Sequence, residues 1–193
     1  MNNNFYKNIY QEMYENGYKD NPSETSSSEF IDFLLSNFNF HSSLNIGCGN
    51  GREMEILKEK GKASIGIDIS ESAVKKCVDN GRVAAVASIL DIPFSENEFD
   101  ITVTSDVIEH LKEEDLIRAF NESFRVCKSN FISNISIKES NAKEKYIDLK
   151  KHGINNLHLT VRDLNWWSEF LSSNFKKHSI IRKKKHIIAI ISK

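Results

Sequence analysis

Short apolar runs alternate with amphipathic stretches along most of this chain. Five runs are rich in Ile, Val and Ala and predict strands: residues 43–46, 64–69, 83–89, 99–105 and 130–137. Between them, apolar positions recur at helical spacing over residues 52–60, 70–80 and 113–126. Strands that alternate with helices predict a parallel sheet with right-handed crossovers. The run at 83–89 is apolar nearly throughout, so we expect a strand covered on both faces.

The last part of the chain predicts a different connection. Residues 177–181 and 186–191 are strand-like, and only a short basic segment separates them. That separation is too short for a helical crossover, so the two runs should form an antiparallel hairpin. We therefore expect an α/β fold: a doubly wound, mostly parallel seven-stranded sheet with a C-terminal antiparallel hairpin and helices on both faces.

The first residues are polar and carry regularly spaced tyrosines. Four of them fall along one helical stripe, four residues apart: Tyr6, Tyr10, Tyr14 and Tyr18. Such a stripe either docks a helix onto the main domain or closes as a lid over a ligand. We expect residues 1–28 to form an N-terminal helical lid or extension, and residues 29–193 to form the main domain.

Composition places the chain among ordinary globular proteins. Its 193 residues are enough for one full core, and the net charge of −1 gives no bulk electrostatic reason to expect a nucleic acid or a membrane. The three cysteines are widely spaced and form no metal or disulfide pattern: Cys48, Cys77 and Cys127. No apolar run approaches the ~20 residues that span a bilayer, and the first residues lack a signal peptide's apolar core. We expect a cytoplasmic protein.

A glycine cluster organises the chemistry. Gly47, Gly49 and Gly51 follow the run at 43–46, and a good helix former comes next. Glycine is favoured where the backbone takes positive φ or where a ligand approaches closely. In open α/β sheets, a turn between strand and helix lies at the carboxyl edge, where ligands bind. The N–H groups that begin the helix favour a ligand with polar groups.

Acidic residues follow other predicted strands at the same edge. Asp68 ends its strand and suits a hydrogen bond to both hydroxyls of a ribose, although such a residue is also a common helix cap. Asp91 can accept from an exocyclic amine such as that of adenine, with Ile92 against the ring; otherwise Asp91 only forms the turn before Pro93. Asp106 follows the strand at 99–105.

The motifs together resemble class I, Rossmann-like S-adenosylmethionine-dependent methyltransferases of the type 11/12 kind. The matching segments read LNIGCGNGRE, GIDIS and LDIPFSENEFDITVTSDVIEHL, followed by the terminal hairpin. The spacing G-x-G-x-G differs from the G-x-G-x-x-G fingerprint of nicotinamide dehydrogenases. The resemblance implies S-adenosyl-L-methionine as cofactor, S-adenosyl-L-homocysteine as product, and these cofactor-binding residues: Gly47, Cys48, Gly49, Gly51, Asp68, Ile69, Asp91, Ile92, Ser105 and Asp106.

An oxygen nucleophile also needs a base. His110 and His158 are the candidates, although His110 is equally interpreted as an ordinary histidine near a helix start. The resemblance predicts methyl transfer to an oxygen or nitrogen of a small polar acceptor such as a sugar or nucleotide-sugar. We expect no metal, no membrane and no nucleic acid as partner, and a monomer or homodimer.

Two alternatives stay open. Asp106, Glu109 and His110 share one face of a helical turn and, with His158, offer ligands for a divalent metal. That set is similar to RNA 3′-terminal 2′-O-methyltransferases, with Asp106 where that family has glutamate. The other alternative is a non-enzymatic, S-adenosylmethionine-binding partner subunit.

Overall fold

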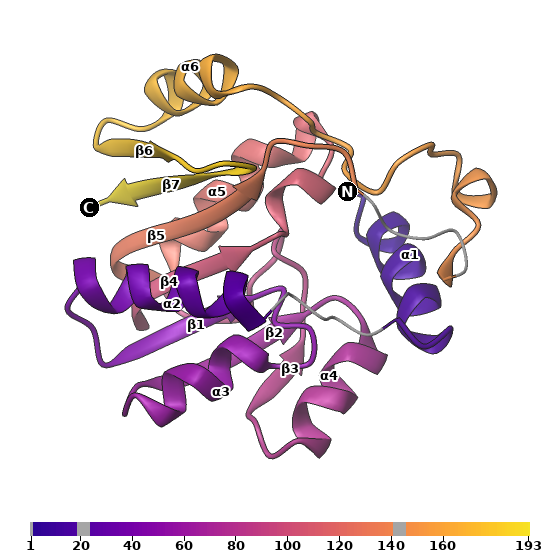
Figure 1. Ribbon diagram of the computed structural model, residues 1–193, viewed down its shortest axis with the longest axis horizontal. Coiled ribbons are helices and arrows are strands. Elements are labelled where there is room, and N and C mark those ends of the chain that lie inside the picture. Colours follow the sequence, from indigo (N-terminus) through magenta and orange to yellow (C-terminus); the bar gives the residue numbers. More distant parts are fainter. Residues whose placement is uncertain (1, 19–23, 141–145) are drawn as a thin grey trace.

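A seven-stranded sheet lies at the centre of the computed structural model, which describes residues 2–18, 24–140 and 146–193 (Figure 1). The strands are β1 Ser42–Ile46, β2 Ala63–Asp68, β3 Ala84–Val86, β4 Phe99–Ser105, β5 Cys127–Ser136, β6 His178–Arg182 and β7 His186–Ser192. Their order across the sheet is β3-β2-β1-β4-β5-β7-β6. The first five strands are parallel, and β7 is antiparallel to both β5 and β6. The predicted fold class is confirmed, hairpin included.

Helices cover both faces of the sheet. They are α1 Asn3–Glu15, α2 Glu24–Asn37, α3 Arg52–Glu59, α4 Glu71–Asp79, α5 Glu113–Arg125 and α6 Leu164–Asn174, with 3₁₀ turns η1 Ile108–His110 and η3 Leu149–His152. Alternate side chains of the central strands point to opposite faces. On β4, Ile101 and Val103 join a core with α2 and α3, whereas Phe131 of β5 joins the core under α5 and α6. Figure 1 shows α2 and α3 on the near side of the sheet.

The expectation for the run at 83–89 is wrong in length and in burial. Only Ala84–Val86 pair as a strand, and Val83 and Val86 are 65% and 46% exposed. β3 pairs with β2 alone because it lies at the edge of the sheet. An edge strand lacks the neighbours that would cover it, so its apolar composition does not imply burial there.

Helix α1 packs beside α4 at the carboxyl ends of the parallel strands (Figure 1). The Tyr6 hydroxyl donates to Asp115 at 2.6 Å and accepts the Lys112 N–H at 2.9 Å, which fastens α1 to the start of α5. Gln11 accepts the Ser70 hydroxyl and so reaches the cap of α4. The expected boundary at residue 28 lies inside α2 (Glu24–Asn37), so the structure places no break there.

Candidate active site

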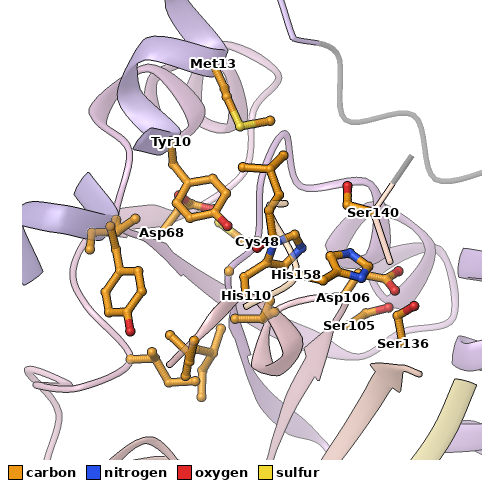
Figure 2. A pocket seen from close by; sticks show the side chains of 18 of the residues that line it. Tyr10, Met13, Cys48, Asp68, Ser105, Asp106, His110, Ser136, Ser140 and His158 are labelled. Atoms are coloured by element: carbon orange, nitrogen blue, oxygen red, sulfur yellow. Dashed lines mark hydrogen bonds between the residues drawn. The ribbon is translucent and has the colours of Figure 1, made fainter. Parts of the chain in front are cut away.

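A cavity of about 1120 Å³ opens at the carboxyl edge of the sheet beneath α1. Drug-sized ligands occupy cavities of roughly 300–1,000 Å³, so this one has room for two small molecules side by side. Its walls combine the glycine turn, the ends of β2, β4 and β5, and the start of β7. Figure 2 shows Tyr10 and Met13 on one side, and His110 and His158 between Asp68 and the Ser105–Asp106 end.

The glycine turn forms one wall. Gly47, Gly49 and Gly51 all have positive φ, at 72°, 53° and 83°. A Cβ on Gly47 would lie 2.4 Å from Val107 Cγ2, and one on Gly51 would lie 2.7 Å from the sulfur of Cys77. Both positions therefore need glycine. Gly47 and Cys48 line the cavity, whereas Gly49 and Gly51 shape the turn from behind.

Asp68, the last residue of β2, lies directly beside the glycine turn. One carboxylate oxygen accepts the Gly49 N–H at 3.0 Å, and the other accepts the Ser70 N–H at 2.9 Å. Burial raises the pKa of this carboxyl, and the backbone donors oppose that shift. A carboxylate has about four acceptor positions, so lone pairs remain for ligand hydroxyls. Asp68 therefore positions the chain before α4, and its contact with a ribose stays a prediction.

Asp91 and Ile92 are not among the residues that line the cavity, and their contact with a ligand stays a prediction. The chain turns back directly after β3, where the Asp91 N–H donates to the carbonyl oxygen of Ser88. Asp91 is exposed, and Ile92 is buried in the core. Ala87, Ser88 and Ile89 line this end instead.

The end of β4 is held in an uncommon backbone conformation. Asp106 has a φ of 54°, and its N–H donates to the Asn134 carbonyl oxygen at 3.0 Å. Its carboxylate lies 3.0 Å from His186 Nε2, at the start of β7. Non-glycine residues rarely adopt positive φ, and such residues concentrate at functional sites. Ser105 and Asp106 both line the cavity.

His110 and His158 meet in the middle of the cavity. Their ring centroids are 4.6 Å apart with the rings nearly perpendicular. Nδ1 of His110 lies 3.0 Å from the Leu157 carbonyl oxygen, and Nδ1 of His158 faces the Lys138 carbonyl oxygen. Burial, and then the nearby His158, lower the pKa of His110 to about 4; burial also lowers the pKa of His158. Both imidazoles are therefore neutral at pH 7.

Glu109 lies behind the two histidines and is fully buried. One of its oxygens accepts the Ser136 N–H at 2.9 Å, whereas Oε2 has no hydrogen-bond partner among the described residues. Burial, and then the neighbouring Asp106, raise the pKa of the Glu109 carboxyl well above its usual range.

The four tyrosines of the stripe pack the N-terminal segment onto the main domain and also cover the cavity. Tyr6 and Tyr14 are buried, and all four tyrosines line the cavity. Tyr10 packs edge-on against His110, with ring centroids 5.7 Å apart.

The two adjacent tryptophans of α6 lie away from the cavity. Neither Trp166 nor Trp167 lines it, and Trp167 is fully buried against Phe120.

Several positions that line the cavity were not predicted from the sequence. Ser88, Ser136, Lys185 and His186 line the cavity without any motif to mark them. Gly66 had a signal, since glycine inside a strand often marks close packing. A Cβ there would lie 2.6 Å from the sulfur of Cys48.

Comparisons with known proteins match the part of the chain that carries the glycine turn and Asp68. Residues 44–131 match the family model described as a methyltransferase domain. A tRNA (carboxymethyluridine(34)-5-O)-methyltransferase of Arabidopsis thaliana is 34% identical over 86 residues, which are 44% of this chain and 21% of that protein. The chain thus spans about a fifth of the length of this curated relative.

Solved structures show the same fold. A methyltransferase from Archaeoglobus fulgidus, described as S-adenosylmethionine-dependent, gives a TM-score of 0.66 at 16% identity, covering 88% of this chain and 94% of that one. Magnesium protoporphyrin IX methyltransferase from Synechocystis PCC 6803, crystallised with S-adenosylmethionine, gives 0.62 at 14% identity, with 88% and 78% covered.

Residues 44–131 therefore match a methyltransferase domain, and the whole fold is similar to that of solved methyltransferases, one of them crystallised with S-adenosylmethionine. The site fits this cofactor on its own geometry. The Gly47 wall admits no Cβ, Asp68 keeps free lone pairs, and the cavity exceeds the volume of one small ligand. Among the described residues, no helix is long and apolar enough to cross a membrane.

Proposed function

We propose that this protein transfers a methyl group from S-adenosylmethionine to an oxygen, or a nitrogen, of a small polar acceptor. The observation that carries the proposal is one cavity that joins the glycine turn and Asp68 to the His110–His158 pair. S-Adenosylmethionine supplies a methyl group that its sulfonium already activates, and it leaves as S-adenosylhomocysteine. The chain's task is to orient the acceptor, exclude water and handle one proton.

The residues divide these tasks between them. Gly47, Cys48 and Asp68 hold the cofactor, and α1 shields it from water. The acceptor oxygen forms its bond to the methyl carbon while the carbon–sulfur bond breaks and its electron pair stays on sulfur. The acceptor proton goes to the imidazole pair, because His110 and His158 are neutral and line the cavity.

The polarity of the far end supports a polar acceptor. Ser136, Ser140 and His158 line it, and Lys138 and Lys185 lie exposed at its mouth. The three cysteines of the chain are free and buried, which supports a reducing compartment such as the cytoplasm.

RNA is the second candidate acceptor. The curated relative is a tRNA 5-O-methyltransferase, and the two lysines at the mouth suit a phosphate backbone. The small acceptor is preferred because the net charge of −1 gives no bulk electrostatic attraction to a nucleic acid.

Transfer of a labelled methyl group tests the proposal. The protein is incubated with S-adenosylmethionine that is labelled at the methyl group. Small-molecule and RNA fractions, both prepared from cells that produce the protein, serve as acceptors. We expect label in the small-molecule fraction with wild type, and at least about tenfold less with Asp68→Asn. Label that nuclease releases from RNA would favour the second candidate. Binding of S-adenosylhomocysteine without any methyl transfer would favour the non-enzymatic partner subunit.

A further inference from the structure

We infer that Glu109, His110 and His158 form a binding site for one divalent transition-metal ion at the wall of the cavity that the two histidines line. One potential ligand atom from each residue lies within 4.8 Å of the others. This inference departs from the expectation of a metal-free site. It rests on the proposed function for the role of the ion, but not for its binding.

The orientation of the histidine rings is the first argument. Each Nδ1 faces a backbone carbonyl oxygen, so each Nδ1 carries the proton and each Nε2 carries a lone pair. No described residue donates a hydrogen bond to either Nε2. Metal-binding histidines usually donate their other ring N–H to a carbonyl or carboxylate, which fixes ring and tautomer. His110 and His158 both have this arrangement.

The buried carboxylate is a second, independent argument. Oε2 of Glu109 accepts no hydrogen bond from the described residues, although the side chain is fully buried. Such an unmet acceptor costs about 1–3 kcal/mol. Its close neighbour Asp106 is also an acceptor, so the two carboxylates pair only through a proton or a cation. The ligand atoms of one carboxyl group and two imidazoles therefore converge, and no hydrogen bond among the described residues places another side chain between them.

The donor set favours particular ions. Two imidazoles and one carboxylate suit Mn²⁺, Fe²⁺, Co²⁺ or Zn²⁺, whereas Mg²⁺ and Ca²⁺ prefer oxygen ligands throughout. Asp106 stands outside the set because His186 holds its carboxylate at 3.0 Å. This three-residue set differs from the four-residue cluster in the sequence.

Three protein ligands leave a coordination position open, as catalytic metal sites do. His110 and His158 line the same cavity as Asp68, so the open position faces the acceptor. A hydroxyl bound to the ion has a lowered pKa. With the ion bound, the two imidazoles hold the metal, and the acceptor proton goes instead to the Asp106 carboxylate, which lines the same cavity.

Cobalt titration tests the site. The full chain is freed of metal with a chelator, and Co²⁺ binding is followed by visible absorption and equilibrium dialysis. We expect one Co²⁺ per chain. Glu109→Gln, which keeps an acceptor for the Ser136 N–H, and His158→Ala should each weaken binding by at least about tenfold. The matched control is His178→Ala, since Nδ1 of His178 also faces a carbonyl oxygen, at 2.8 Å, outside the cavity.

Two results would overturn the inference: no stoichiometric Co²⁺ on wild type, or wild-type affinity in both ligand variants. S-Adenosylhomocysteine binding, measured in EDTA, confirms that each variant is folded and tests the proposed function separately. If S-adenosylhomocysteine binds but Co²⁺ does not, only the metal site is wrong. If Co²⁺ binds but S-adenosylhomocysteine does not, the proposed function is wrong and the metal site stands.

Discussion

At the scale of single residues, the site depends on contacts that leave no room for substitution. Gly47 faces Val107, Gly51 faces Cys77, and Gly66 faces Cys48, each closer than a Cβ allows. The glycine turn, the strand beside it and the loop after β4 therefore form one rigid wall. The two histidine rings are each oriented by a backbone carbonyl group.

Gly47→Ala, compared with a control glycine, separates the cost of the contact with Val107 from the cost of positive φ. The new Cβ would lie 2.4 Å from Val107, so we expect more than ~2 kcal/mol of destabilisation and loss of S-adenosylhomocysteine binding. Gly61→Ala is the matched control, because Gly61 has a similar φ of 73° but nothing within 4 Å. It should cost only the ~1–2 kcal/mol of the left-handed conformation. Urea unfolding measures both; equal losses would contradict the explanation.

The lowered pKa of His110 predicts how the free energy of unfolding depends on pH. Its pKa is about 4 when folded and ordinarily 6.5, so the unfolded chain binds more protons between these values. The free energy of unfolding should therefore fall as pH drops from 6.5 to 4, and His158 acts in the same direction. The raised pKa of Glu109 acts in the opposite direction. We expect a shallower slope for His110→Gln, measured by urea unfolding in EDTA. An unchanged slope would show that His110 titrates normally.

At the scale of elements, α1 matters most for function because it covers the cavity while it is fastened at several points. Tyr6 bonds to the start of α5, Gln11 to the cap of α4, and Glu12 to His152 of η3. Ile9 and Met13 of α1 are buried with Ile147 and Leu157. The helix is thus a wall of the site and not a separate appendage.

Tyr6→Phe tests how firmly α1 is held. Removing the hydroxyl leaves the Lys112 N–H and one Asp115 contact without a partner, so we expect a loss of about 1–3 kcal/mol. Tyr10→Phe is the matched control on the same stripe, because no hydrogen bond to the Tyr10 hydroxyl exists among the described residues. It should stay within ~0.5 kcal/mol of wild type. A large loss in the control, or none in Tyr6→Phe, would contradict this view.

At the scale of the whole molecule, periodicity was enough to predict the sheet, because alternating strands and helices leave few permitted topologies. It did not show that β3 lies at an edge, since edge and centre strands can share one composition. Spacing from a strand also does not show where the chain turns back, so no sequence signal indicated that Ser88 and not Asp91 lines the cavity. The pairing of Asp106 with His186 spans 80 residues, and only the folded sheet brings β7 beside β5 to make it.

S-Adenosylhomocysteine binding tests the central claim most directly. At ~100 times its dissociation constant, a ligand of the folded state adds about 2.7 kcal/mol to the free energy of unfolding. We predict this gain for wild type and for Asp91→Ala, whose side chain lies outside the cavity. Asp68→Asn should bind at least about tenfold more weakly, because a charged acceptor is lost. No stabilisation of wild type, or equal binding by Asp68→Asn, would contradict the assignment of this cavity to the cofactor.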